Sequence, residues 1–257
     1  MHLKYAFDKP IEIKKNAIFI ADSHHHSLYR NTLDDFLDSL MKIPQTQIFL
    51  MGDIFDFLVG GIKECLRDNQ PTLQKLESLS KIHEIFYFEG NHDFILSKIP
   101  YFYNIHCIEL AQQPVIFLLN NREVFLAHGD IFINQKYRFY TFLIRNTFLI
   151  TLLAFLNRFI SIYPQIIKHL KAKKIHYGLP NVKNFILQRI DCYQKKYPQK
   201  TNFDIIEGHF HLGEKMQNHQ INYQGLTSFS CKKEYFIVEF QNNCLSLTKK
   251  EFLGDKF

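Results

Sequence analysis

The sequence of 257 residues is poor in the residues that build disulfide scaffolds and fibrous proteins. It has five cysteines, an odd number, and no two of them have the C-x-x-C spacing. This excludes a disulfide scaffold and a cysteine-type zinc site, and it favours a reducing compartment. Ten glycines and eight prolines are too few for a fibrous or low-complexity protein.

Long hydrophobic runs are also missing. The apolar stretch from Phe148 to Leu156 is shorter than the ~20 residues that a bilayer-spanning helix needs. Asp8, Glu12 and Lys14 interrupt the N-terminal residues, so we expect no secretory signal. Because 46% of the residues are apolar, the chain can bury a sizeable core, and we expect a single cytosolic-type globular domain over residues 1–257.

Acidic residues are nearly absent from residues 131–200. This segment holds thirteen Lys and Arg residues but only one acid, Asp191, so its net charge is +12. The whole chain carries +6, which leaves −6 for the remainder. A charge split of this size predicts a segment with its own task, facing an anionic partner.

The same segment is predicted to be a helical insertion in which basic, aromatic and aliphatic residues mix. Arg145 and Arg158 flank its apolar stretch. Two interpretations stay open. The stretch is a core helix of the insertion, or it is an amphipathic lid that touches lipid while Lys and Arg meet phosphate head groups. Both can hold, since a lid helix can pack on the domain with one face and present the other.

The rest of the chain repeats one local pattern, in which a short apolar run ends in metal-binding types of residue. These runs lie at 18–21, 48–51, 85–88, 124–127 and 203–206. Continuous apolar runs of this length suit strands buried on both faces. Helical spacing over 32–40 and 73–82 indicates βαβ units, and mostly antiparallel strands are expected after residue 211.

The polar residues that follow these runs share one chemistry. They offer carboxylate, carboxamide and imidazole donors and no thiolate: Asp22, His24, Asp53, Asn91, His128, His209 and His211. The carboxyl ends of strands in an open α/β sheet form one crevice, so these side chains should converge. Such donors fit two divalent ions such as manganese, iron or zinc, and a bridging Asp53 would set the ions ~3.5–4 Å apart.

The order of the motifs along the chain is informative. They are Asp22-Ser23-His24, Gly52-Asp53-Ile54-Phe55-Asp56, Gly90-Asn91-His92-Asp93, His128, and Gly208-His209-Phe210-His211. This series resembles that of the calcineurin-like metallophosphoesterases: D-x-H, G-D-x-x-D, G-N-H-D/E, a later His and G-H-x-H. The resemblance implies a mixed α/β fold, namely a four-layer αββα sandwich with a dimetal site at the strand ends.

The resemblance also implies a role for each motif residue. One metal takes Asp22, His24, Asp53 and His211. The other takes Asp53, Asn91, His128 and His209. His92 is then the non-ligand histidine beside the scissile phosphate, and Asp56 is the carboxylate that orients it.

Within that family, the insertion narrows the substrate. A basic, aromatic insertion directly after Ala127-His128-Gly129-Asp130 resembles the UDP-2,3-diacylglucosamine pyrophosphatases of lipid A synthesis, whose helical cap holds acyl chains over the metals. The resemblance implies that residues 131–200 form such a cap and that the nucleotide lipid is cleaved to UMP and 2,3-diacylglucosamine 1-phosphate. It further implies two divalent ions, manganese first, and a peripheral position on the cytoplasmic face of the inner membrane.

The substrate-binding residues of the cap cannot be assigned by matching positions with that subfamily, because residues 131–136 lack the acidic residues that are usual there. Its commonest form also has Arg at the position of His92, whereas a variant branch has His. On charge and proximity to the site alone, the candidates for substrate binding in the cap are Lys136, Tyr137, Arg138 and Arg145. Asn91 and His92 are candidates outside the cap.

Two other functions stay open from the sequence. One is a soluble phosphatase or phosphodiesterase whose basic insertion contacts a phosphoprotein or, less favoured, nucleic acid. The other is a non-catalytic scaffold on the same fold, which the complete donor set argues against. His25 and His26 extend the first motif, and we expect them to pack locally or face solvent rather than to add ligands.

Overall fold

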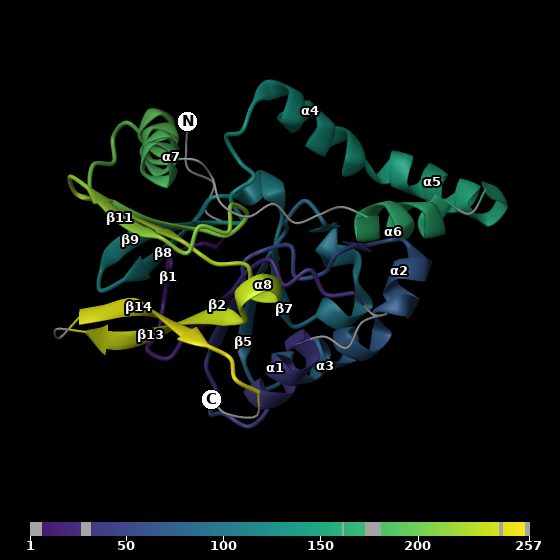
Figure 1. The fold of residues 1–257 in the computed structure, drawn as a ribbon, viewed down its shortest axis with the longest axis horizontal. Helices are drawn as coiled ribbons and strands as arrows, with labels where there is room; N and C mark the ends of the chain where they lie inside the picture. The colour runs from purple at the N-terminus through teal and green to yellow at the C-terminus, as the bar shows by residue number, and fades with distance from the viewer. Residues whose placement is uncertain (1–6, 27–31, 161, 173–180, 242–243, 255–257) are drawn as a thin grey trace.

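The computed structural model describes residues 7–26, 32–160, 162–172, 181–241 and 244–254. Two six-stranded sheets lie face to face (Figure 1). The first sheet has the order β14 (Cys244–Glu251), β13 (Glu234–Gln241), β2 (Ile18–Ile20), β3 (Gln47–Leu50), β5 (Glu84–Phe88), β7 (Ile105–Ile108). The second has the order β1 (Ile11–Glu12), β8 (Val115–Leu119), β9 (Arg122–Ala127), β10 (Phe203–Glu207), β12 (Ile221–Gly225), β11 (Lys215–Asn218). A small third sheet pairs β4 (Leu58–Val59) with β6 (Asp93–Phe94).

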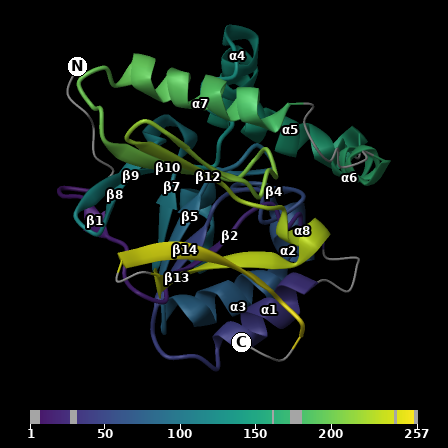
Figure 2. The same cartoon turned by 60° about the vertical axis from the view of Figure 1, so that its left-hand side comes forward.

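Helices cover the outer faces of both sheets (Figure 2). On the first sheet lie α1 (Thr32–Leu40) and α3 (Gln70–Ser80), with α2 (Lys63–Asp68) and α8 (Phe229–Lys232) nearby. On the second lies α7 (Val182–Lys196). Successive side chains of a strand point to opposite faces. Ile18 and Ile20 therefore join the core under α1 and α3, whereas Phe19 joins the core between the sheets. The four-layer helix–sheet–sheet–helix sandwich is confirmed.

The parallel strands at the centre of each sheet end at the same edge. β2, β3 and β5 are parallel neighbours in the first sheet, and β9 and β10 are parallel neighbours in the second. The predicted helix at 73–82 begins earlier, at Gln70, and follows the unpredicted α2. The antiparallel pairs expected after residue 211 are present, interrupted by the unpredicted short helix α8.

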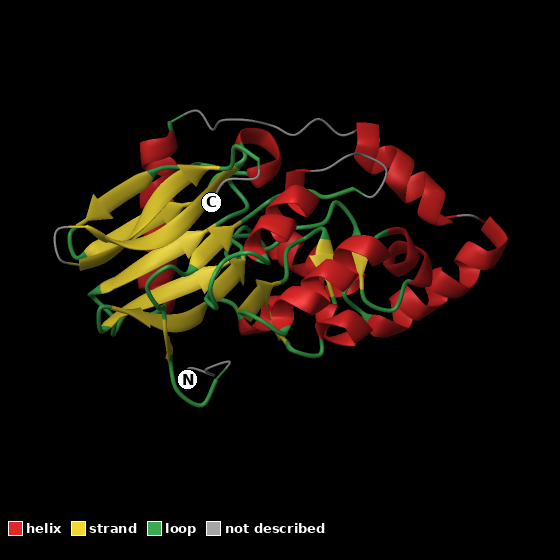
Figure 3. Cartoon of the chain, turned by 90° about the horizontal axis from the view of Figure 1, so that it is seen from below, coloured by secondary structure: helices red, strands yellow, loops and turns green. Residues whose placement is uncertain are grey.

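The insertion contains two different parts. Helices α4 (Gln135–Ile144), α5 (Thr147–Ile160) and α6 (Ile162–Ala172) project from the sandwich as an arm, at the right of Figure 1 and of Figure 3. In contrast, α7 packs on the second sheet, with Ile186, Ile190 and Tyr193 buried among sheet residues. Of the expected cap at 131–200, residues 161 and 173–180 lie outside the described part.

The arm packs on the domain with one side and exposes apolar side chains with another. Ile150 is buried in the core of the first sheet, and the Tyr163 hydroxyl donates to Asp68 at 2.9 Å. Large exposed apolar side chains of α4 and α5 are Phe139, Tyr140, Phe142, Leu143, Phe148, Leu152, Leu153 and Phe155. Within the described residues no single helix meets the length and apolarity of a membrane span, whereas α4 with Thr147–Asn157 meets them as a pair bent by 56°.

Candidate metal centre

Five strands carry the predicted donors to one edge of the sandwich. Asp22 follows β2, Asp53 follows β3 and Asn91 follows β5. From the second sheet, His128 follows β9 and His209 follows β10. Because these strands end together, residues almost two hundred positions apart come within reach of one cation.

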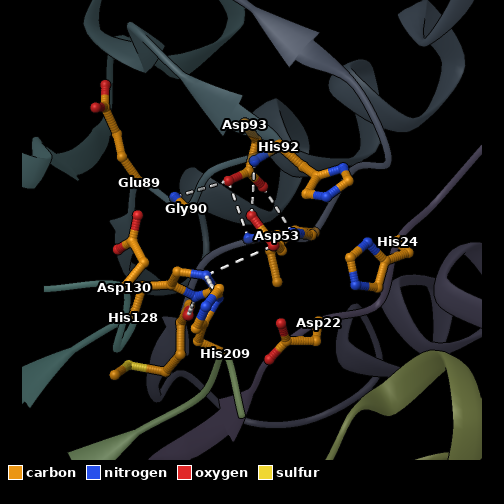
Figure 4. A network of polar contacts seen from close by, with 12 residues as sticks. Asp22, His24, Asp53, Glu89, Gly90, His92, Asp93, His128, Asp130 and His209 are labelled. Atoms are coloured by element: carbon orange, nitrogen blue, oxygen red, sulfur yellow. Dashed lines mark hydrogen bonds and ion pairs between the residues drawn. The ribbon is translucent and has the colours of Figure 1, made fainter. Parts of the chain in front are cut away.

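The donor atoms converge on neighbouring positions (Figure 4). Three groups each have ligand atoms within 4.8 Å of one another: Asp22, His24 and His211; His24, Asp53 and His92; Asp53, His128 and His209. The Nε2 atom of His211 lies 3.1 Å from Oδ1 of Asp22, and Nε2 of His128 lies 3.5 Å from Oδ2 of Asp53. Since Asp53 belongs to two of the groups, its carboxylate is placed to serve two ions.

Several of these atoms are buried without a hydrogen-bond partner among the described residues. Neither carboxylate oxygen of Asp22 accepts a well-directed hydrogen bond, and the same holds for Nδ1 of His24 and Oδ1 of Asn91. An uncompensated buried carboxylate is costly unless it is paired or coordinates a metal. Buried oxygen and imidazole donors that lack hydrogen-bond partners fit divalent ions such as manganese, iron or zinc.

Protonation of the histidines is consistent with this fit. Burial, followed by the neighbouring His128, lowers the pKa of His209 to about 3, and burial also lowers the pKa of His24. Both rings are therefore neutral and can offer a lone pair. Burial alone would lower the pKa of His128, but the carboxylate of Asp53 raises it, which shows that this position favours positive charge. The Nδ1–H of His128 donates to the Met51 carbonyl at 2.8 Å, which directs Nε2 at Asp53.

The local backbone is shaped for this convergence. Asp22, His24, Asp53 and His211 have positive φ angles between 44° and 54°, a region that few residues other than glycine adopt. Such strained residues concentrate at functional sites, where the surrounding structure holds them in place. At Gly52, with φ +86°, a Cβ atom would collide with the ring of His128, so the glycine of the second motif is required by close packing.

His92, expected to be a non-ligand histidine, lies close enough to His24 and Asp53 to be part of one of the three donor groups. Its Nδ1–H donates to the main-chain carbonyl of Asp56 at 2.8 Å, while the Asp56 carboxylate is 3.7 Å away. The backbone oxygen, rather than the predicted carboxylate, therefore makes the hydrogen bond that orients the ring. His92 also donates its main-chain N–H to Oδ1 of Asp53 at 2.8 Å, which ties the loop to the centre.

Asp93 holds the turn of the third motif. Its carboxylate accepts main-chain N–H groups from Asp53 at 2.9 Å, Ile54 at 2.6 Å and Gly90 at 3.0 Å, and the hydroxyl of Tyr87 at 2.6 Å. Burial, followed by Asp53, raises its pKa to about 7. The sequence did not identify Tyr87 as a partner.

A buried arginine clamp was also missed. Arg189 of α7 binds both oxygens of Glu207, at 3.0 and 2.5 Å, and donates to the carbonyls of Gly129 and Ile131. The Glu207 carboxylate also accepts the hydroxyl of Tyr193. The clamp thus joins α7 to the segments that carry His128 and His209. Only the tertiary structure shows this, because Arg189 resembles the other cations of the insertion in sequence.

The four cap candidates differ in position. Arg145 Nη2 donates to the Gly90 carbonyl at 2.6 Å, and the Tyr137 hydroxyl donates to Asp130 at 3.1 Å. In contrast, Lys136 and Arg138 are exposed on α4. The structure therefore brings two of the four candidates to the loops of the centre.

His25 packs locally and does not join the three donor groups. Its ring nitrogen Nε2 lies 2.9 Å from the Thr72 hydroxyl, and burial lowers its pKa to about 4. This agrees with a packing role and excludes the solvent-facing position that the sequence left open.

Comparison with known proteins adds the family. A model of the calcineurin-like phosphoesterases matches residues 16–213. The UDP-2,3-diacylglucosamine hydrolase of Histophilus somni (strain 2336) is 27% identical over 118 residues, which are 45% of this chain and 50% of that protein. The protein of the same name from Aromatoleum aromaticum is 26% identical over 164 residues, 61% of this chain and 64% of its own. The chain thus spans between half and two thirds of these relatives.

Among solved structures, Yfce, a phosphoesterase from E. coli, aligns with 91% of this chain and 98% of its own, at 13% identity and a TM-score of 0.42. The family match over residues 16–213 includes every segment that contributes a donor to the centre. This protein therefore belongs to the calcineurin-like phosphoesterases, a family of metallophosphoesterases.

Proposed function

We propose that this protein hydrolyses the pyrophosphate bond of UDP-2,3-diacylglucosamine and releases UMP and 2,3-diacylglucosamine 1-phosphate. One observation carries the proposal. The arm with exposed aromatic side chains is joined directly to the loop of His92, through the 2.6 Å hydrogen bond from Arg145 to Gly90. An amphiphilic phosphoester needs an apolar surface beside a phosphate site, and the curated relatives carry the name of that hydrolase.

The proposed ligands are the two predicted sets. Two divalent ions, manganese by preference, would be held by Asp22, His24, Asp53 and His211 and by Asp53, Asn91, His128 and His209. When bound, such ions supply Lewis acidity and lower the pKa of water.

The chain's own residues orient the phosphate and handle protons. Because Nδ1 of His92 donates to the Asp56 carbonyl, Nε2 is the ring atom available to a phosphoryl or leaving oxygen. His92, with the Asp56 carboxylate 3.7 Å from its ring, is proposed to give a proton to the leaving oxygen. Tyr137 is proposed to contact substrate at the centre, with the exposed side chains of Lys136 and Arg138 beside it on α4.

We further propose that the arm rests on the cytoplasmic face of the inner membrane. Exposed Phe142 and Phe148 would enter the interface, while the excess of Lys and Arg in the insertion meets anionic head groups. The proposed substrate carries two acyl chains, so the two proposals support each other.

The decisive experiment measures UMP release from UDP-2,3-diacylglucosamine by purified protein with Mn²⁺, with Asp53→Asn as the control. We expect release that the control lacks. If the nucleotide lipid stays intact while bis(p-nitrophenyl) phosphate is hydrolysed well, the protein is a soluble phosphodiesterase. If neither compound is cleaved and the protein purifies with well under one metal per chain, it is a scaffold.

A further inference from the structure

Arg145 lies at the junction between the arm and the proposed catalytic loop, which we define as Gly90–Asp93. It is the residue at the C-terminal end of α4, and its main-chain N–H donates to Thr141 of that helix at 3.3 Å. Its side chain is only 13% exposed. A long cation that is this well buried must find partners, and its partners decide its role.

Three partners of the guanidinium lie in the catalytic loop or directly beside it. Nη2 donates to the Gly90 carbonyl at 2.6 Å, and Nε lies 3.6 Å from the carboxylate of Glu89. The guanidinium carbon lies 5.0 Å from the centre of the Phe94 ring, within the range of a cation–π contact. One side chain of the arm thus contacts the segment on both sides of Asn91 and His92.

The side chain of Glu89 is buried at the same junction. Its side chain is 2% exposed, and it accepts the main-chain N–H of Leu96 at 3.1 Å. Burial raises its pKa, while the charge of Arg145 acts in the opposite direction. In Figure 4, Glu89 and Gly90 lie on the opposite side of the centre from His24.

The inner side of the loop is fixed by the centre itself. Asp93 accepts the Gly90 N–H, Asp53 accepts the His92 N–H, and a Cβ at Gly90 would collide with Asp53. The Gly90 carbonyl, on the peptide that leads into Asn91, is instead held by Arg145. The position of Asn91 therefore depends on where the C-terminal end of α4 places Arg145.

We propose that Arg145 is a positioning residue that transmits the seating of α4 to the catalytic loop, with Glu89 as its counter-ion. This deepens the proposed function and rests on the proposed roles of Asn91 and His92. It makes turnover depend on the arm even for a substrate too small to touch it. A role confined to substrate binding would leave such a substrate unaffected.

The test uses full-length protein with Mn²⁺ and bis(p-nitrophenyl) phosphate, a soluble diester without acyl chains. Arg145→Gln should lower kcat about tenfold or more and change KM less than about twofold, because a small displacement of catalytic groups affects mainly the chemical step. Arg145→Lys should recover part of the rate, since it keeps a charge and a donor but lacks the planar fork. Lys168→Gln, which removes one exposed cation from α6 of the same insertion, should keep wild-type kinetics.

Glu89→Gln tests the pair. It should lower kcat in the same direction, and the double variant should be no slower than Arg145→Gln, because two groups that act as a unit are not additive. Amide hydrogen exchange gives a readout without turnover. The Leu96 N–H, which donates to Glu89, should exchange faster in Arg145→Gln and as in wild type in Lys168→Gln.

Two results would overturn the proposal. One is wild-type turnover of the diester by Arg145→Gln, with a raised KM only for UDP-2,3-diacylglucosamine, which would make Arg145 a substrate ligand. The other is unchanged Leu96 exchange. If Arg145→Gln does not fold, Arg145→Lys and Glu89→Gln give the same comparison. Wild-type protein that cleaves neither compound would contradict the proposed function instead, while the exchange measurement would still decide the positioning role.

Discussion

The loops of the metal centre and the arm of α4–α6 leave opposite kinds of groups unsatisfied. In the loops, buried polar atoms such as both carboxylate oxygens of Asp22 accept no well-directed hydrogen bond from the described residues. In the arm, Phe142 and Phe148 are 67% and 77% exposed to water. Each arrangement costs free energy in the isolated chain, which favours a cation in the loops and the apolar partner proposed above for the arm.

Removing the cations should have the largest effect, and it should affect the metal centre but not the arm. Treatment with EDTA should abolish hydrolysis, and Mn²⁺ should restore it, because the donor set is complete without rearrangement of the fold. Binding to vesicles of phosphatidylglycerol and phosphatidylethanolamine should not change, since the arm supplies none of the proposed ligands. Co-sedimentation measured beside UMP release checks this. Loss of vesicle binding on chelation would show that the two regions are coupled through the metals.

Substituting the shared carboxylate should have the next largest effect. Asp53→Asn removes a charge that both donor groups use. A loss of several kcal/mol of transition-state stabilisation corresponds to a fall in kcat/KM of about a thousandfold. Metal analysis should show less than half of the wild-type content, with an unchanged circular dichroism spectrum. Wild-type metal content in this variant would contradict the bridging role.

The clamp that joins the insertion to the centre should govern stability. Arg189→Met leaves the buried Glu207 carboxylate without its cation, which should lower the free energy of unfolding by about 3–5 kcal/mol in urea titrations. The matched control is Lys195→Met, which breaks an exposed ion pair with Asp191 on the same helix and should leave the unfolding midpoint unchanged. Equal midpoints for the two variants would count against the clamp.

Changes confined to the arm should have the smallest effect on the centre. Phe142→Ser or Phe148→Ser should lower vesicle partitioning about tenfold each, since burial of one Phe is worth ~1.5–3 kcal/mol. Turnover of bis(p-nitrophenyl) phosphate should stay the same, and the free energy of unfolding should change by less than about 0.5 kcal/mol. Tyr103→Ser, at a residue 94% exposed away from the arm, is the control. Unchanged partitioning of both Phe variants would refute the membrane surface.

Much of the centre was predictable because its residues act through local rules. A strand that is buried on both faces must be apolar, and the residue after it is free to be polar, so Asp22, Asp53 and His128 stand out in sequence. The contacts between elements were not predictable. Asp56 orients His92 through a main-chain oxygen, which every residue type has, and Arg189 is one of thirteen cations in its segment.

The structure of the insertion was likewise predictable only in part. Its charge and its helices were evident from composition and spacing, but its separation into a projecting arm and a sheet-packed α7 was not. Amphipathic spacing tells which side of a helix is apolar and does not tell what covers that side.

By itself, the amino-acid sequence determined the strands, the order of the donor motifs and therefore the family, because these depend on residue type and short-range spacing. The tertiary structure decided which cation pairs with which carboxylate, which loop the arm contacts and which apolar face stays open. Those outcomes depend on distances between segments far apart in the chain, and such distances are set only when the two sheets stack and bury their shared core.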